Sequence, residues 1–196
     1  MITTFSIILA RMLREKLKLL LIEKSDIKSR ISVRSINEVG IDVYRNAYGE
    51  PRMITASMLK AVLREASGSV KSHPFSLQFL ETEWNSVVDA WQITNCEDYK
   101  SVPRLGRKIR LSQNQREILW SIFTIVRSRL AKEGLVTMSM VFSDATEWVK
   151  RQKVIPADYV VIDEAQDISV HQLRFLAATG AHKTDGLFFA GDLGQR

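Results

Sequence analysis

Cysteine is almost absent from this sequence, which has one, Cys96, among its 196 residues. A single cysteine excludes an internal disulfide, and such usage is typical of a reducing compartment. The three histidines are scattered and have no second cysteine to join them, so no zinc site is expected; they are His73, His171 and His182. We therefore predict a cytoplasmic protein without a disulfide or zinc, in which His171 lies at the surface.

Long hydrophobic runs are also missing. The most apolar stretch, Phe5–Ile22, is interrupted by charges such as Arg11 and Arg14, and it contains no unbroken apolar run longer than Ile7–Ala10. Such a run is too short for a signal-peptide core or a membrane span, so no membrane contact is expected. The apolar residues instead recur at helical spacing, which predicts an amphipathic helix packed in the core. They are Phe5, Leu9, Met12, Leu13, Leu17, Leu20 and Leu21.

A glycine-rich phosphate loop cannot be found in the chain either. Such a loop needs Gly-Lys-Ser or Gly-Lys-Thr before a helix, because its backbone amides cradle the phosphates and its lysine reaches them. None of the nine glycines is followed by lysine, and the nearest approach is Gly106-Arg107-Lys108. The chain therefore lacks the element that holds the phosphates in nucleoside triphosphatases.

The most informative feature that is present is a short apolar run, Tyr159–Ile162, which leads directly into Asp163 and Glu164. Its β-branched residues predict a strand buried on both faces, as in a parallel sheet. Ligands of open α/β sheets bind beyond the carboxyl ends of the strands, so both carboxylates are expected at a ligand-binding edge. In nucleoside triphosphatases one acid there binds Mg²⁺, and a neighbour orients or deprotonates the attacking water. The plainer alternatives are a helix cap and a salt-bridged strand end.

A second strand with a polar end follows. The run Leu187–Ala190 is apolar and leads into Gly191–Gln195, which reads Gly-Asp-Leu-Gly-Gln. Between the two strands, Ser169 and Gly180 suit the start and the end of a helix. The pattern predicts a βαβ unit whose polar tips converge on one edge of the sheet. An ordinary turn is the alternative for the segment after the second strand.

Asp163–Asp167, which reads Asp-Glu-Ala-Gln-Asp, and Gly191–Gln195 resemble motifs II and III of superfamily 1 DNA helicases of the UvrD/Rep type. Their order, their spacing and the intervening helix and strand agree with that family. Thr3–Ser6, followed by a helix with two arginines, resembles motif Ia. Val33–Gly40 lies at the position of motif Ib, with Ser-Ile-Asn in place of the more usual Thr-Phe-His. The resemblance spans nearly the whole chain and is most specific from Tyr159 onward.

The resemblance implies an α/β fold that is helix-rich overall: part of a RecA-like P-loop NTPase parallel sheet with an inserted helical subdomain. In that family the phosphate loop precedes motif Ia, and a second motor domain with an arginine finger follows motif III. We therefore expect an internal piece of a helicase, either a cloned fragment or a truncated gene product, that does not hydrolyse ATP at a useful rate alone. The complete protein is expected to use ATP and Mg²⁺ to translocate 3′-to-5′ on single-stranded DNA and to unwind duplexes.

The resemblance and the side-chain chemistry together suggest roles for the polar residues that follow the two strands. Asp163 would hold the Mg²⁺ that bridges the β- and γ-phosphates, and Glu164 would position and activate the attacking water. The amide of Gln195 both donates and accepts hydrogen bonds, so it would sense the γ-phosphate and report its presence to the DNA side. The residues expected to couple these groups are Gln166, Asp167 and Asp192, and Asp192 is also expected to contact the nucleotide together with Asp163 and Gln195.

The positive charge is concentrated between Tyr99 and Arg116, where six basic residues occur without an acidic one. A basic loop with Tyr99 and Trp91 as stacking platforms would suit a nucleic acid strand. A solvated surface is the alternative for this loop, and core packing is the alternative for Phe5 in motif Ia. The residues expected to contact DNA, as a single strand or at a junction with duplex, are Thr4, Phe5, Ser6, Arg104, Arg107, Lys108 and Arg110.

The middle of the chain is helical rather than strand-forming. Ser112–Glu133 is the clearest helix, because Ser112 and Gln115 form a capping-box pattern and Gly134 can end it. We predict three segments: residues 1–44 as the first part of the motor domain with motifs Ia and Ib, 45–135 as the helical insertion, and 136–196 as the return to the motor domain with motifs II and III.

Two other classes of function remain open. The chain could be a nucleic-acid-binding or protein-interaction module, descended from a helicase, in which the acidic site is idle. It could also belong to a larger enzyme in which the helicase segment is joined to a nuclease or a partner-binding domain.

Overall fold

The computed structural model describes residues 1–70, 73–102, 110–152, 156–192 and 194. The chain divides into two compact units, one formed by Met1–Pro51 with Val141–Arg196 and the other by Arg52–Met140. The second unit overlaps the segment 45–135 that the sequence marks as helical. Among the described residues, no helix has both the length and the apolar character that crossing a membrane requires.

The first unit is built on a parallel sheet with the strand order β2-β1-β3-β4. The strands are β1 (Ile2–Thr4), β2 (Val33–Ser35), β3 (Val160–Asp163) and β4 (Leu187–Phe189). At the carboxyl end of β1, Thr4 is in register with Ser35 on one side and Asp163 on the other. The α/β class, the parallel sheet and the two strands predicted within Tyr159–Ile162 and Leu187–Ala190 are therefore confirmed.

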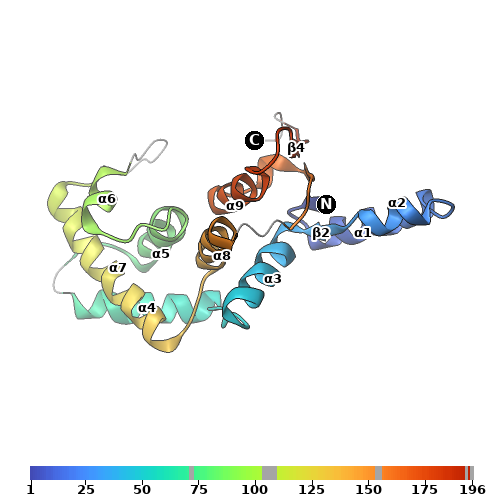
Figure 1. The fold of residues 1–196 in the computed structure, drawn as a ribbon. Helices are drawn as coiled ribbons and strands as arrows, with labels where there is room; N and C mark the ends of the chain where they lie inside the picture. The colour runs from blue at the N-terminus through green and yellow to red at the C-terminus, as the bar shows by residue number, and fades with distance from the viewer. Residues whose placement is uncertain (71–72, 103–109, 153–155, 193, 195–196) are drawn as a thin grey trace. The chain divides into compact units, whose positions relative to one another are not determined.

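Helices connect these strands, as Figure 1 shows. They are α1 (Ile7–Leu20), α2 (Ser25–Arg30), α3 (Ile36–Tyr48), α8 (Met138–Gln152), the short 3-10 turn η2 (Ala165–Asp167) and α9 (Val170–Gly180). The predicted start of α9 is confirmed, since Ser169 forms a capping box with Gln172. Gly180 is the last residue of this helix, and close packing favours glycine there, because a Cβ would lie 2.5 Å from Cγ of Leu187.

The two faces of the sheet are covered to different extents. Val160 and Ile162 are buried, whereas Val161 between them is 37% exposed and Phe188, paired with Val161, is 64% exposed. The prediction that β3 is buried on both faces is therefore wrong. Alternate residues of a strand point to opposite faces, and α1 packs mainly against β1 and β2 rather than against β3 and β4.

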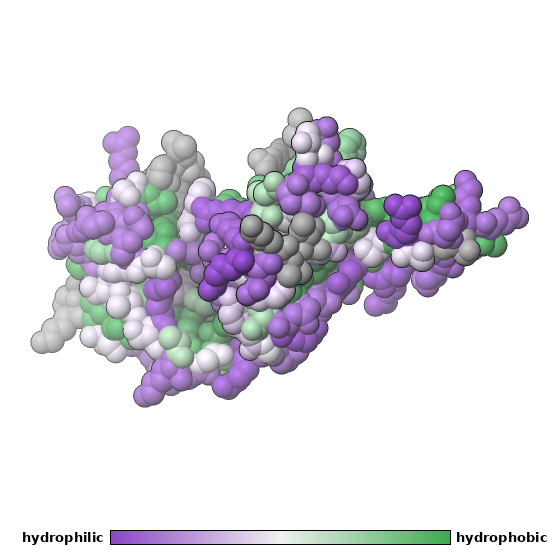
Figure 2. Space-filling view, in the orientation of Figure 1, coloured by the Kyte–Doolittle hydropathy of each residue, from purple (hydrophilic) through white to green (hydrophobic). Residues whose placement is uncertain are grey.

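The helix predicted within Phe5–Ile22 is present as α1, but its predicted place in the core is wrong. Of its residues only Ala10 is buried, while Ile8 is 72% exposed and Leu20 is 77% exposed. Figures 1 and 2 show α1 and α2 running out from the sheet, with hydrophobic residues at their surface among hydrophilic ones. One side of α1 faces the sheet, and no other described element of this unit covers the opposite side.

The second unit is helical. Its elements are α4 (Ala56–Ser69), α5 (Leu77–Glu83), the π-helix η1 (Trp84–Asp89), α6 (Cys96–Ser101) and α7 (Gln113–Glu133). The predicted capping box of Ser112 with Gln115 is present at the start of α7, and Gly134 follows its end in the left-handed conformation with φ 62°. The segments by which the chain enters and leaves this unit run parallel to each other and form an isolated β-bridge between Met53 and Val136.

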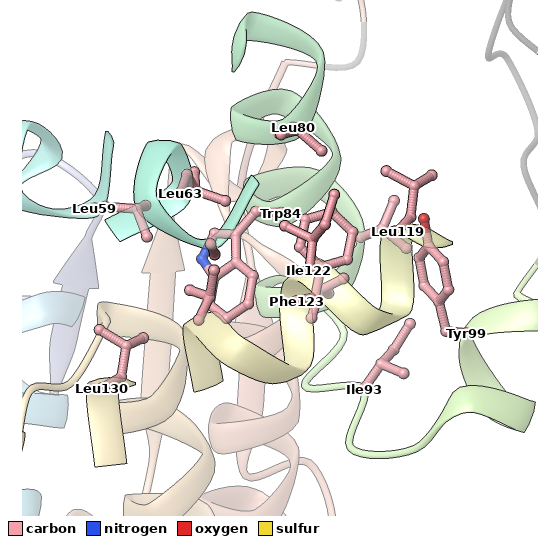
Figure 3. Close-up of a cluster of buried hydrophobic side chains, with 14 of the residues drawn as sticks. Leu59, Leu63, Leu80, Trp84, Ile93, Tyr99, Leu119, Ile122, Phe123 and Leu130 are labelled. Atoms are coloured by element: carbon pink, nitrogen blue, oxygen red, sulfur yellow. The ribbon is translucent and has the colours of Figure 1, made fainter. Parts of the chain in front are cut away.

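A single hydrophobic core holds the helical unit together, and Figure 3 shows its central side chains. Ile122 and Phe123 of α7 and Trp84 of η1 have no exposed surface. The rings of Trp84 and Phe123 lie 5.8 Å apart between centroids in a tilted arrangement, which is a favourable aromatic geometry. Because α4, α5, η1, α6 and α7 all contribute to this cluster, its packing determines the stability of the unit.

Candidate functional site

The carboxyl edge of the sheet brings together the residues that follow β1, β3 and β4. Asp163 is the last residue of β3 and is half-buried. Its Oδ1 accepts a hydrogen bond from the backbone N–H of Glu164 at 3.1 Å. This is the edge at which open parallel sheets bind their ligands.

Glu164 adopts a backbone conformation that is uncommon for a residue with a side chain. Its φ of 55° and ψ of 46° lie in the left-handed region, where crowding of Cβ costs free energy. The turn is closed by the N–H of Asp167, which donates to the carbonyl of Glu164 at 3.0 Å. The carboxylate of Glu164 accepts a hydrogen bond from Nε2 of Gln166. The surrounding contacts therefore hold Glu164 beside the strand end despite the strain.

Gln166 joins the loop after β3 to the loop after β4. Its Nε2 donates to Glu164, and its Oε1 accepts the backbone N–H of Asp192 at 3.2 Å. The N–H of Ala165 also donates to the carbonyl of Ala190 at 2.9 Å. A Cβ on Gly191 would lie 2.5 Å from Oε1 of Gln166 and 3.1 Å from the backbone nitrogen of Ala165, so a larger residue there would displace the Gln166 amide and crowd the two loops. The sequence suggested Gln166 as a coupling residue but did not reveal this bridge.

Asp192 lies on the exposed second loop, and its Oδ1 accepts the N–H of Gly194 at 2.8 Å. Gln195 lies outside the described residues, as do three of the predicted DNA-contacting residues, Arg104, Arg107 and Lys108.

The segment Thr3–Ser6, which resembles motif Ia, covers the end of β1 and the residues just after it at the same edge. Thr4 has no exposed surface, and its hydroxyl has no hydrogen-bond partner in the described structure. Ser6 accepts the N–H of Leu9 at 3.2 Å and so caps α1. Phe5 lies between them and is 46% exposed. Of these three predicted DNA-contacting residues, Phe5 therefore offers the largest surface to a ligand.

Residues of Val33–Gly40, the segment that resembles motif Ib, support the fold rather than present themselves to solvent. Ser35 forms a capping box with Glu38 at the start of α3, and Ile36 is fully buried. The side chain of Asn37 accepts a hydrogen bond from Nε2 of Gln172 at 2.9 Å, which links α3 to α9. The hydrogen-bonding and packing surfaces of this segment are thus used within the unit.

The basic stretch is described only at its two ends. Lys100 pairs with Glu117 at 2.8 Å and with Glu97 at 3.4 Å, so its charge is compensated within the unit. Arg110 is exposed just before α7. Tyr99 is 1% exposed and donates a hydrogen bond to Glu83 at 2.8 Å, so the prediction that it serves as a stacking platform is wrong. Trp91 is 45% exposed.

His171 was predicted at the surface, but it is half-buried at the start of α9. Its ring lies 5.4 Å from the ring of Phe142 between centroids, and its Nε2 is 2.9 Å from Oγ of Ser169. Burial, with a smaller effect of the charge on Arg174, lowers the pKa of His171 from 6.5 to about 4. The imidazole is therefore neutral in the folded protein at neutral pH.

This lowered pKa predicts that the folded state loses stability as the pH falls from about 6.5 to about 4. In that interval the unfolded chain takes up a proton at His171, whereas the folded chain does not. His171→Gln is expected to reduce the loss, because glutamine does not titrate. Urea denaturation at pH 7 and pH 5 measures it, and an unchanged pH dependence in the variant would contradict the assignment.

The carboxylate oxygens at the carboxyl edge of the sheet suit a magnesium ion whose remaining ligands come from a phosphate and water. Among the described residues, no three His, Cys, Asp or Glu side chains are grouped so as to hold a metal ion by themselves. Mg²⁺ is commonly bound by one or two carboxylates while substrate phosphates and water supply the remaining oxygens. Asp163 uses one carboxylate oxygen to accept the Glu164 N–H, which leaves the other oxygen for a cation.

Comparison of the sequence with models of known protein families and with curated proteins finds no match in either. The geometry of the carboxyl edge is therefore the basis on which a function can be proposed.

Proposed function

We propose that this chain is the part of a UvrD/Rep-type, RecA-like motor domain that carries motifs Ia, Ib, II and III. Its function would then be ATP-driven translocation on single-stranded DNA and unwinding of duplex DNA. The proposal rests on the Gln166 bridge, which ties the loop carrying Glu164 to the loop carrying Asp192 at the carboxyl edge of a parallel sheet. A helix cap or an isolated turn would need no such link between the two loops.

Each polar residue of the edge has a role in this proposal. Asp163 would hold Mg²⁺, and the ion, when bound, would offset negative charge on the phosphates. Glu164 would orient the attacking water and accept its proton on the side-chain carboxylate. Gln166 is a positioning residue, because its amide donates to the Glu164 carboxylate while accepting the N–H of Asp192.

The edge of the sheet at β4 supports the same proposal. Among the described strands β4 is terminal, and Phe188 and Phe189 on it are 64% and 46% exposed. Parallel sheets of α/β proteins normally have both faces covered. A strand that carries a phosphate loop and its following helix would cover these rings.

A second candidate function is a helicase-derived nucleic-acid-binding or protein-interaction module without ATPase activity. It is favoured by the absence of any Gly-Lys-Ser or Gly-Lys-Thr from the sequence. The coding sequence on both sides of this segment separates the two candidates. A phosphate loop upstream and further helicase motifs downstream support the motor. Start and stop codons at Met1 and Arg196 support the module.

Binding of single-stranded DNA tests the surface next to the edge. Phe5→Ala is expected to weaken binding by roughly 5- to 150-fold, since stacking of one base on an aromatic ring contributes about 1–3 kcal/mol. Fluorescence anisotropy of a labelled oligodeoxythymidine measures the affinity. Phe188→Ala removes a more exposed phenylalanine from β4 and is the matched control, expected to leave the affinity unchanged. Equal effects of the two substitutions, or none, would exclude Phe5 as the stacking residue.

A further inference from the structure

The first unit contains a cavity of about 390 Å³ on the side of the sheet opposite the acidic edge. It is lined by Arg14, Leu17, Lys18, Lys28, Ile31, Ser32, Val33 and Arg34. Arg14 of α1 donates to the carbonyl of Val33, the first residue of β2, so the cavity lies beside the amino end of β2. The cavity is therefore separate from the site formed by Asp163 and Glu164.

Four of the eight lining residues are basic and none is acidic. Lys18 pairs with Glu15 and Arg34 pairs with Asp42, so these two charges are compensated outside the cavity. Lys28 is exposed and has no carboxylate within ion-pair distance among the described residues. One cationic group at the rim is thus available to an anion.

Arg14 is a second cation of the lining, and two hydrogen bonds hold it in place. Its Nε and Nη2 both donate to the carbonyl oxygen of Val33, at 3.1 and 2.8 Å. After the larger effect of hydrogen bonds to the two groups, the guanidinium charge also lowers the pKa of the nearby Glu15 and Glu38 carboxyls, but in the described structure its hydrogen bonds go to the Val33 carbonyl and leave Nη1 to donate to a ligand. A guanidinium fixed in this way suits a carboxylate or phosphate, because little side-chain entropy remains to be lost on binding.

The rest of the lining is aliphatic. Val33 is buried, and Leu17 and Ile31 are half-buried, so they form an apolar floor beneath the cations. None of the lining residues is aromatic, so the cavity offers no platform on which a nucleobase could stack. The volume lies in the range of small-molecule sites. A ligand with an aliphatic body and one anionic head group would complement both the apolar floor and the cations of this cavity.

We propose that this cavity binds a small organic anion with an aliphatic body, its carboxylate between Arg14 and Lys28 and its chain on Leu17, Ile31 and Val33. The proposal is independent of the motor function. A ligand there would contact α1, α2 and β2 together and would cover apolar surface that no described element covers.

Decanoate below its micelle-forming concentration is the probe, and isothermal titration calorimetry with the whole chain is the measurement. Saturable binding at one site is expected, with decanol at least about tenfold weaker because it lacks the charge that the two cations recognise. Inorganic phosphate is expected to bind more weakly than decanoate, since it lacks the aliphatic body. Equal affinity for decanoate and decanol would overturn the proposal, and so would tighter binding of phosphate.

The substitution Lys28→Gln tests whether decanoate binds in this cavity. Lys28 is exposed, so the variant is expected to fold, and its affinity for decanoate is expected to fall about tenfold. The matched control is Lys16→Gln, which removes an exposed lysine of α1 that does not line the cavity. Unchanged affinity in the control supports the site. An equal loss in both variants would show that decanoate binds the exposed apolar surface of α1 instead, and it would overturn the proposal.

Discussion

Glu164→Gln is expected to lower the rate of ATP hydrolysis by at least about 100-fold and to leave nucleotide binding intact, in a protein that joins this chain to a phosphate loop and a second motor domain. Glutamine has nearly the shape of glutamate, so the turn after β3 is preserved. Its neutral amide cannot accept a proton from the attacking water. DNA-stimulated phosphate release measures the rate, and binding of a fluorescent ATP analogue measures the affinity.

The matched control for this substitution is Glu147→Gln. Glu147 is exposed on α8 and pairs with Lys150, so removing its charge is expected to change neither quantity. Normal turnover in Glu164→Gln would remove the catalytic role from Glu164. Loss of nucleotide binding together with turnover would instead indicate that Glu164 supports the structure of the edge.

Ile122→Ala is expected to lower the free energy of unfolding of the helical unit by about 2–5 kcal/mol. Ile122 has no exposed surface and lies in the centre of the cluster in Figure 3, between Trp84 and Leu119. Truncation leaves a cavity that the surrounding helices can only partly fill. Urea denaturation followed by tryptophan fluorescence measures the change, because Trp84 and Trp120 report on this unit.

Ile125→Ala is the control, because Ile125 is on the same helix but is 39% exposed. Its truncation is expected to cost less than about 1 kcal/mol, since less apolar surface is removed from the interior. A similar loss of stability in both variants would show that the helix propensity of α7, rather than the core, determines the stability of the unit.

Local patterns in the sequence predicted much of the fold. The strand before Asp163, the helix capped by Ser169 and the strand before Gly191 are present, as is the long helix between Ser112 and Gly134. Such elements depend on hydrophobic periodicity and on side chains that cap helix ends a few residues away. Both are properties of short stretches of sequence, so they can be predicted without knowledge of the fold.

Burial could not be predicted in the same way. The apolar residues of α1 have the spacing of a core helix, yet Leu20 is 77% exposed, whereas the polar Thr4 has no exposed surface. Tyr99 is buried by its packing in the helical unit, and His171 by Phe142. Each outcome depends on what distant segments place against the residue, and periodicity carries no information about that.

The sequence by itself determined where Asp163 and Glu164 lie, because residues that end or directly follow a strand of a parallel sheet lie at its carboxyl edge. Only the tertiary structure decided how the two acidic loops are joined. The Gln166 bridge links residues 26 positions apart, and it depends on the close approach that Gly191 allows. The same holds for the cavity beside α1, whose cations come from separate elements that the chain brings together only on folding. Local structure follows from neighbouring residues, while a site follows from contacts between residues that are far apart in sequence.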